Sequence, residues 1–325
     1  MPIQVEHLYH TYLPGSPFSA VAVHDISMTV EDGEFLGILG HTGSGKTTLI
    51  QHFNGLLKPT AGRVLVDGLD ITPKGISLLE LRKKVGMVFQ YPEHQLFEET
   101  VAKDIAFGPK NLGLAKETIE ERVREACRQV QLDYDAIGQR SPFELSGGQM
   151  RKVAIAGVMA MHPRVLVLDE PAAGLDPSGR RGILNMIRTL HAQGGLTVIM
   201  VSHNMDDIAS MATRLVVMSK GSLVMTGTPR EIFVHEEQLR SIGLGVPQPA
   251  ELTHALIAEG FDLPSDLYTL AEVRDHLLRL FQPAPQPEEA HSAARSDKHA
   301  KRACSDVPAS GQNAGAGGKE EETSC

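Results

Sequence analysis

GHTGSGKTT, residues 40–48, is the stretch that decides the fold of this 325-residue chain. An apolar run of strand length, EFLGIL at 34–39, comes directly before it, and a segment of helical periodicity follows. In that setting the glycines let the backbone curl so that successive N–H groups face one phosphate, and the positive end of the helix points at the same anion. A glycine turn beside an exposed lysine is the other interpretation, and the strand-loop-helix context argues against it.

The same stretch predicts ligands for a nucleotide triphosphate and its metal ion. Lys46 would place a point charge near the β- and γ-phosphates, and the Thr47 hydroxyl would bind magnesium. We expect the phosphates to be held by the whole stretch, namely Gly40, His41, Thr42, Gly43, Ser44, Gly45, Lys46, Thr47 and Thr48.

A second apolar run, VLVLDEP at 165–171, carries two adjacent carboxylates. It would bring Asp169 and Glu170 to the carboxyl edge of the sheet, where open α/β sheets bind their ligands. Asp169 would belong to the magnesium shell, and Glu170 could polarise the water that attacks the γ-phosphate. Taken alone, the pair reads as a solvated turn; together with the phosphate-binding loop it favours a metal site.

The remaining apolar runs of strand length, VGMVF (85–89), LTVIMV (196–201) and RLVVM (214–218), alternate with helical segments. That alternation predicts a parallel sheet covered by helices on both faces. Between residues 100 and 145 the pattern is helical only, which indicates a helical subdomain inserted in the α/β core. One face of a helix there is apolar, formed by Ile119, Val123, Cys127 and Val130.

About a hundred residues after the first stretch comes LSGGQ, residues 145–149. Ser146 is a good N-cap, and Gly147 and Gly148 allow close backbone approach, so a second helix N-terminus could hold a phosphate. An ordinary capped helix after a flexible turn is the alternative that the residues alone leave open.

Through these motifs the chain resembles the ATP-binding subunits of ABC transporters over about residues 3–245. The resemblance rests on six motifs in order: the loop at 40–47, Gln90, LSGGQ, the strand at 165–170, AGLDP at 173–177, and His203. It implies that two such subunits stack head to tail, so that LSGGQ of one closes over the ATP held by the loop of the other.

The resemblance also implies individual roles. Tyr12 would stack on adenine, Gln90 would contact magnesium and sense the γ-phosphate, and Glu170 would be the general base. His203 would steady the γ-phosphate, and Asp176 would communicate across the dimer. The residues expected to touch the partner's nucleotide are Ser146, Gly147, Gly148 and Gln149. Taken alone, Tyr12, Gln90 and His203 each have an ordinary structural interpretation.

A finer resemblance is to energy-coupling factor (ECF) transporters, specifically the second of their two ATPase subtypes. It rests on residues 89–113, residues 141–161, and a C-terminal helical extension around GFDLP at 260–264. One departure is Ala172, where the family usually has threonine; because Glu170 and Asp176 are intact, we still expect hydrolysis.

We therefore expect an α/β fold: a P-loop ABC ATPase core at 3–245, with an N-terminal antiparallel β portion and a helical subdomain at about 95–160. A C-terminal helical extension at 246–282 would follow, and the tail at 283–325 has almost nothing to bury and should be disordered. In the extension, Thr269 and Glu272 have capping-box spacing. The stripe of Leu270, Val273, Leu277 and Phe281 should be buried, and another subunit could cover it.

Composition limits the setting of the chain. A net charge of −9 provides no basic field for nucleic acid, and three scattered cysteines suggest a reducing compartment. We see no signal peptide and no apolar run of about eighteen residues, so we expect the chain not to cross a membrane by itself. The resemblance instead implies a peripheral protein on the cytoplasmic face of the membrane.

The expected function is an ATPase, with ATP and Mg²⁺ as cofactors, that drives uptake of a vitamin or transition-metal ion. The implied partners are a paralogous ATPase subunit or a second copy, a transmembrane T subunit and a substrate-binding S subunit. A cobalt or nickel importer, or another conventional ABC importer, is the nearest alternative. A non-transport ABC ATPase fits less well, and a P-loop kinase or GTPase would leave LSGGQ unexplained.

Overall fold

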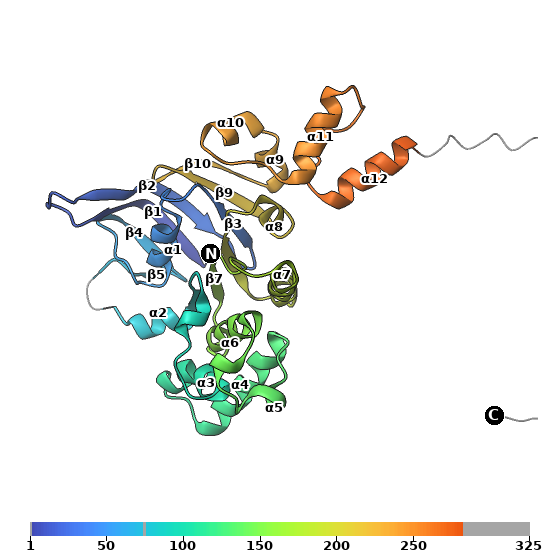
Figure 1. The fold of residues 1–325 in the computed structure, drawn as a ribbon. Coiled ribbons are helices and arrows are strands. Elements are labelled where there is room, and N and C mark those ends of the chain that lie inside the picture. The colour runs from blue at the N-terminus through green and yellow to red at the C-terminus, as the bar shows by residue number, and fades with distance from the viewer. Residues whose placement is uncertain (1, 74–75, 282–325) are drawn as a thin grey trace, which may run out of the picture. The chain divides into compact units, whose positions relative to one another are not determined.

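The computed structural model describes residues 2–73 and 76–281. Within them a six-stranded sheet, in the order β10-β9-β3-β8-β7-β6, forms the centre of the fold (Figure 1). All its strands run parallel except β10, which pairs antiparallel with β9 at one edge. The strands are β3 (Phe35–Leu39), β6 (Val85–Val88), β7 (Val165–Asp169), β8 (Thr197–Val201), β9 (Arg214–Ser219) and β10 (Ser222–Gly227). The predicted parallel sheet is confirmed, and each of the predicted apolar runs contains one of its strands.

Strand β3 shows why the sheet needs cover on both faces. Phe35 and Leu39 belong to one buried core and Leu36 and Ile38 to the other, because successive side chains point to opposite faces. Between them Gly37 leaves no room for a side chain, since a Cβ there would lie 2.6 Å from Ile208. Helix packing on this strand therefore requires the glycine.

A second, antiparallel sheet in the order β2-β1-β4-β5 covers one face, which confirms the expected N-terminal antiparallel portion. Its strands are β1 (Ile3–Tyr12), β2 (Ala20–Val30), β4 (Ala61–Val66) and β5 (Leu69–Asp70). Helix α1 (Lys46–Phe53) contributes Leu49, Ile50 and Phe53 to a core shared by both sheets. The helix that follows the phosphate-binding loop is thus fixed by apolar contacts from two directions.

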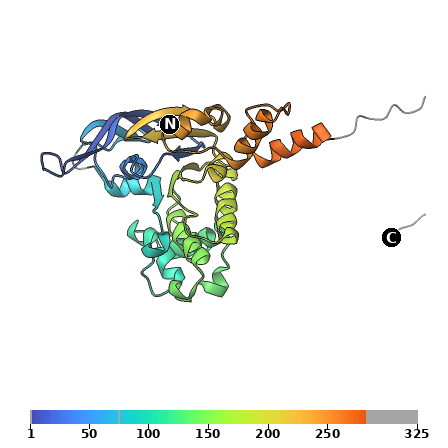
Figure 2. The same ribbon diagram turned by 45° about the horizontal axis from the view of Figure 1, so that its top comes forward.

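The segment predicted to be helical is helical, and it is placed to one side of the sheets. In Figure 2 this segment, coloured teal to green, lies below the strands. Its elements are η1 (Pro92–Gln95), α3 (Val101–Asn111), α4 (Lys116–Gln129), α5 (Tyr134–Ile137), η2 (Pro142–Glu144) and α6 (Gly147–Met159), preceded by α2 (Leu78–Lys84). The apolar face expected at 119–130 is confirmed, since Val123, Cys127 and Val130 are buried and Ile119 packs against them.

Four further helices complete the cassette: α7 (Pro177–Ala192), α8 (Met205–Ala209), α9 (Pro229–Phe233) and α10 (Glu236–Ser241). Helix α7 buries Ile183, Met186 and Ile187 in the same core that receives α4 and α6. The helical segment and the sheet face beneath α7 therefore share one continuous apolar core, so their packing is coupled.

The C-terminal extension consists of α11 (Gln248–Ala258) and α12 (Leu270–Phe281). Gly260, with φ of 94°, is the C′ glycine that ends α11. The predicted capping box is confirmed: Thr269 Oγ1 accepts from the Glu272 amide at 3.3 Å, and the Glu272 carboxylate accepts from the Thr269 amide at 3.1 Å. The predicted tail at 283–325 lies outside the described residues.

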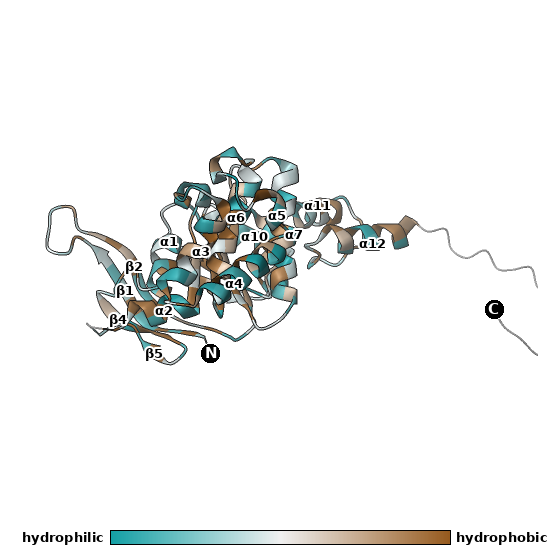
Figure 3. Cartoon of the chain, turned by 90° about the horizontal axis from the view of Figure 1, so that it is seen from below, coloured by the Kyte–Doolittle hydropathy of each residue, from teal (hydrophilic) through white to brown (hydrophobic). Residues whose placement is uncertain are grey.

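The apolar stripe of α12 is covered only in part. Val273 is buried and Leu277 packs in a small cluster with α11, but Leu270 is 73% exposed and Phe281 is 69% exposed. The expected burial of the whole stripe is therefore not reached by contacts among the described residues, and cover by another subunit stays a prediction. Figure 3 shows the uncovered apolar end of α12 in brown.

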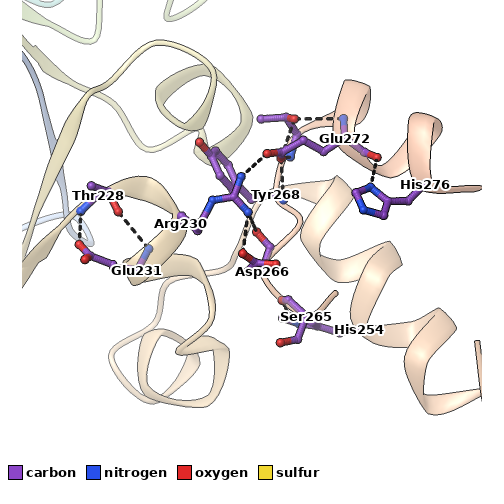
Figure 4. Close-up of polar contacts among 10 residues, drawn as sticks. Thr228, Arg230, Glu231, His254, Ser265, Asp266, Tyr268, Glu272 and His276 are labelled. Carbon is purple, nitrogen blue, oxygen red and sulfur yellow. Dashed lines mark hydrogen bonds and ion pairs between the residues drawn. The ribbon is translucent and has the colours of Figure 1, made fainter. Parts of the chain in front are cut away.

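Arg230, on α9, attaches the extension to the cassette (Figure 4). Its guanidinium donates to the Asp266 backbone oxygen at 3.1 Å and to the Asp266 carboxylate at 2.7 Å. It also pairs with Glu272 and lies over the Tyr268 ring, 5.3 Å from the centroid. The hydrogen bond from Arg230 lowers the pKa of Asp266. One cation thus joins α9 to the loop before α12 and to the first turn of α12.

We expect Arg230→Ala to loosen α12 without unfolding the cassette. These ion pairs are half exposed, so the cost should be on the order of 1 kcal/mol in local opening free energy. Hydrogen exchange should accelerate about fivefold in α12 and stay unchanged in β7. Arg274→Ala is the matched control, because within residues 2–73 and 76–281 the ion pair of Arg274 is with its exposed neighbour Asp275. Equal exchange in both variants would show that Arg230 does not anchor the extension.

Candidate functional site

An open cavity of about 1000 Å³ lies at the carboxyl ends of β3, β7 and β8. It brings together most of the predicted site residues, from parts of the sequence as far apart as β1 and the start of α8. Those on its wall are Tyr12, Gly40, His41, Thr42, Gly43, Gly45, Lys46, Thr47, Thr48, Gln90, Asp169, Glu170 and His203. The position agrees with the rule that open α/β sheets bind ligands at this edge.

The loop before α1 has the backbone geometry that a phosphate site requires. Gly43 and Gly45 have φ of 80° and 97°, and a Cβ on Gly45 would lie 2.5 Å from the Ala22 carbonyl oxygen. Lys46 Nζ donates to the carbonyl oxygens of Gly40 at 2.7 Å and His41 at 3.0 Å. The lysine therefore lies along the loop, with its charge at the entrance to the cradle.

Thr47 and Asp169 are in direct contact. The Thr47 hydroxyl donates to Asp169 Oδ2 at 3.0 Å, and Asp169 is 5% exposed. Burial raises the pKa of Asp169, while the Thr47 hydrogen bond and the Lys46 charge lower it. Hydroxyl, carboxylate and the Gln90 amide oxygen are hard oxygen ligands of the kind Mg²⁺ takes in nucleotide sites. The donor set therefore fits that ion.

Glu170 follows β7 in an unusual conformation and contacts His203. Its φ of 51° is rare for a residue with a side chain, and its amide donates to the Val201 carbonyl oxygen at 3.0 Å. Glu170 Oε1 lies 2.9 Å from His203 Nδ1, with the carboxylate 13% and the imidazole 72% exposed. Burial raises the pKa of Glu170, and His203 lowers it. The backbone thus aims a partly desolvated carboxylate into the cavity.

Tyr12 ends β1 at the cavity wall, and the residue is 40% exposed. Its hydroxyl lies 3.2 Å from Thr48 Oγ1, and its ring packs edge-on against His10 with centroids 4.7 Å apart. These contacts hold the ring beside the phosphate-binding loop and leave part of it free. The arrangement is compatible with stacking on a flat base.

The LSGGQ residues lie outside this cavity. Ser146 is the N-cap of α6: its Oγ accepts from the Gln149 amide at 3.3 Å, and Gln149 Oε1 accepts from the Ser146 amide at 3.1 Å. Ser146 and Gly147 are exposed, and Gly148 and Gln149 are partly exposed. Asp176 is also elsewhere, capping α7 through the amides at 178 and 179. Within one chain, the second phosphate-competent helix does not face the first.

The structure adds residues that the sequence reasoning missed. Gly243, Leu244 and Gly245 line the cavity, and no local pattern connects them with it. Arg151, on α6, is 1% exposed and bonds to Glu93. Its spacing of four from Ile155 places it on the buried face of the helix, a signal that could have been used.

The sequence of this chain is similar to those of known transporter ATP-binding proteins. A family model described as ABC transporter matches residues 23–173. The energy-coupling factor transporter ATP-binding protein EcfA2 of Clostridium perfringens is 51% identical over 282 residues, covering 87% of this chain and 99% of that protein. The EcfA2 protein of Symbiobacterium thermophilum is 54% identical over 272 residues, covering 84% and 94%. This chain belongs to the energy-coupling factor ATP-binding proteins of the ABC transporter family.

Solved structures agree with the fold of these ECF ATP-binding proteins. CbiO1 from Clostridium perfringens, described as part of the ABC transporter complex cbiONQ, has a TM-score of 0.67 and 36% identity, covering 79% of this chain and 98% of its own. The ATP-binding cassette MJ0796, solved as a dimer with ADP and Pi, has a TM-score of 0.61 and 25% identity, covering 70% and 98%. The predicted ABC ATPase fold and ECF membership are confirmed. In residues 2–73 and 76–281, no helix is long and apolar enough to cross a bilayer.

A buried imidazole pair supports the nucleotide-binding edge of this ECF ATP-binding protein. His52 is fully buried; its Nδ1 lies 2.7 Å from the Thr48 carbonyl oxygen and its Nε2 lies 3.2 Å from His10 Nδ1. Burial lowers the pKa of His52 from 6.5 to about 4. His52 is therefore neutral in the folded chain at neutral pH.

The free energy of unfolding should fall as pH drops from 6.5 toward 4. In that window the unfolded chain protonates His52 and the folded chain does not, so acid favours unfolding by up to about 3 kcal/mol. Denaturant unfolding at several pH values should show a shallower pH slope for His52→Gln than for wild type. His235→Gln, at an exposed histidine, should keep the wild-type slope. An unchanged slope in His52→Gln would contradict the assignment.

Proposed function

We propose that this chain is the ATP-binding and ATP-hydrolysing subunit of an ECF-type importer and that it powers uptake of a vitamin or transition-metal ion. The observation that carries the proposal is the separation of its two phosphate-competent helices. The loop before α1 lines the cavity, whereas Ser146 is exposed and lies outside it. One chain therefore offers half of a nucleotide site and the closing piece of another.

Within the half-site, different residues would bind the phosphates, the base and the metal ion. The loop amides and Lys46 bind the phosphates, and Tyr12 stacks on the base. Thr47, Asp169 and Gln90 would hold Mg²⁺, which supplies positive charge to the phosphate oxygens. These groups bind and orient the triphosphate at the edge of the sheet, where α1 adds its positive end.

Glu170 is placed to accept a proton from the attacking water. Its raised pKa makes it a stronger base than an exposed glutamate, and its strained backbone keeps the carboxylate directed at the cavity. His203, already 2.9 Å from Glu170, would turn to steady the γ-phosphate. Asp176, at the N-cap of α7, would communicate across the dimer with the partner's nucleotide site.

Completion of the site needs a second ATPase subunit, either a paralogue or a copy of this chain. Its Ser146, Gly147, Gly148 and Gln149 counterparts would close over the nucleotide, and this chain's own would do the same for the partner. The solved relative MJ0796 is described as dimeric, which supports this arrangement.

A membrane partner would dock on the helical segment. A mainly apolar groove of about 340 Å³ there is lined by Leu79, Phe97, Phe107 and Met161. Phe97 and Phe107 are 59% and 42% exposed, with rings packed edge-on 4.8 Å apart. Because η1 connects this groove to Gln90, an apolar segment of a T subunit seated there could respond to nucleotide. Such docking, with an S subunit beside it, would place the chain on the cytoplasmic face of the membrane.

A cobalt or nickel importer is the second candidate, favoured by the similarity to CbiO1, which is described as part of the cbiONQ complex. The transported molecule would be bound by membrane subunits, so this chain does not distinguish the two candidates. Identifying the membrane subunits that co-purify in detergent would decide between them; recovery from the cytosol alone would contradict both.

Glu170→Gln should leave ATP affinity within about twofold and reduce hydrolysis in the assembled complex by about 10²–10⁴-fold, because a carboxamide cannot accept the water's proton. Calorimetry measures the first quantity and phosphate release the second. Glu144→Gln, at an exposed glutamate outside the cavity, is the control. Near-normal turnover in Glu170→Gln would assign the base to another group.

Ser146→Arg tests the composite site. It should leave ATP binding by this chain almost untouched and reduce hydrolysis in the complex, because the bulky side chain obstructs closure over the partner's nucleotide. Lys46→Ala should instead weaken ATP binding by this chain roughly tenfold or more, because it removes a charge-assisted contact to phosphate. If Ser146→Arg impairs ATP binding as much as Lys46→Ala does, LSGGQ serves its own chain's nucleotide and the proposal fails.

A further inference from the structure

The guanidinium of Arg151 is the largest buried charged group in the described residues, and it lies two residues after LSGGQ on α6. Its Nη2 donates to both carboxylate oxygens of Glu93 at 2.9 Å, and its Nε donates to the same carboxylate at 3.2 Å. Glu93 belongs to η1, three residues after Gln90. One half of the guanidinium thus joins α6 to the segment that follows Gln90.

The other half reaches the segment that follows Glu170. Arg151 Nη1 donates to the carbonyl oxygens of Pro171 at 3.1 Å and Ala173 at 2.6 Å. The Ala173 amide in turn donates to the Glu170 carbonyl oxygen at 3.1 Å, which closes a turn directly after the carboxylate. All three nitrogens of one buried side chain are therefore used, and they connect three segments of the site.

Packing alone does not account for this choice of residue. Buried ion pairs are seldom more stabilising than apolar side chains of similar volume, whereas the planar fork of arginine fixes the relative orientation of the groups it bonds. The segments it joins have backbones under strain, since Tyr91 and Glu170 have φ of 56° and 51°. Strained segments can adopt other conformations, so the hydrogen bonds from Arg151 help to determine which conformation each segment takes.

We propose that Arg151 is a positioning residue that transmits the state of this chain's nucleotide site to its LSGGQ. When nucleotide moves Gln90, η1 and Glu93 move with it, and the fork carries α6 along. The first turn of α6 presents Ser146 to the partner's nucleotide, so occupancy of one composite site prepares the other. Arg151 lines neither the cavity nor the LSGGQ surface, and it acts through the residues that do. This inference rests on the composite site proposed above.

The test is hydrogen exchange of the full chain with and without ATP, followed at residues 90–95 and 147–150. In wild type, ATP should slow exchange in both segments by about fivefold or more. In Arg151→Lys, which keeps the charge and loses the fork, residues 90–95 should still respond, while 147–150 should change by less than about twofold. ATP affinity should stay within about twofold, and in the complex kcat should fall with KM unchanged.

Arg214→Lys is the matched control. Arg214 also forks onto a glutamate, Glu34, at 2.5 and 3.1 Å, and also donates to a backbone carbonyl, that of Thr29 at 2.5 Å. It lies outside the cavity and does not contact α6, so both segments should respond to ATP as in wild type. Glu93→Gln is a second variant that leaves the arginine in place, and it should uncouple the segments as Arg151→Lys does.

The outcomes separate this inference from the proposed function. Should wild type bind ATP without any change at 147–150, or should both variants keep the change, Arg151 carries no signal and the inference is wrong. If wild type fails to bind ATP, or if Ser146→Arg leaves hydrolysis in the complex unaltered, the composite site itself is wrong. Loss of response at 90–95 together with 147–150 would reduce Arg151 to a structural support.

Discussion

The constraint on which this structure depends is the close fit of a tight backbone loop against the place where the two sheets adjoin. Gly45 lies against the Ala22 carbonyl of the antiparallel sheet, close enough to exclude any side chain. Beside Ala22, the Gly221 amide, between β9 and β10, donates to the Ser44 carbonyl oxygen at 3.1 Å, and the Gly221 carbonyl accepts from the His24 amide at 2.8 Å. The shape of the phosphate-binding loop is therefore fixed by backbone contacts with both sheets.

Much of the fold followed from local pattern because local physics determines it. Strands buried on both faces are near-continuous apolar runs, and serine is a favoured N-cap directly before a helix, so β3 and α6 were foreseeable. The extent to which α12 is covered was not, because it depends on how far α11 reaches. The same is true of Gly243 and Leu244, whose place at the cavity is fixed only by tertiary packing.

At the site, sequence reasoning found residues by type and spacing but not the contacts between them. It placed Glu170 and His203 in the same cavity, yet the contact between their side chains is visible only in the folded chain. Arg151 was missed because an arginine on a predicted helix is ordinarily a solvated side chain. The carboxylate of Glu93 and the carbonyl oxygens of Pro171 and Ala173 make its burial tolerable. Buried polar groups are thus the part of the site that sequence motifs and spacing predict least well.

Because α1 lies between the two sheets, a nucleotide bound at its N-terminus would also stabilise the fold. Any ligand that binds only the folded loop stabilises the entire fold that shapes it, by about 2.7 kcal/mol when its concentration is 100 times its Kd. A chain with nucleotide bound would therefore open to proteases less often than the same chain without it.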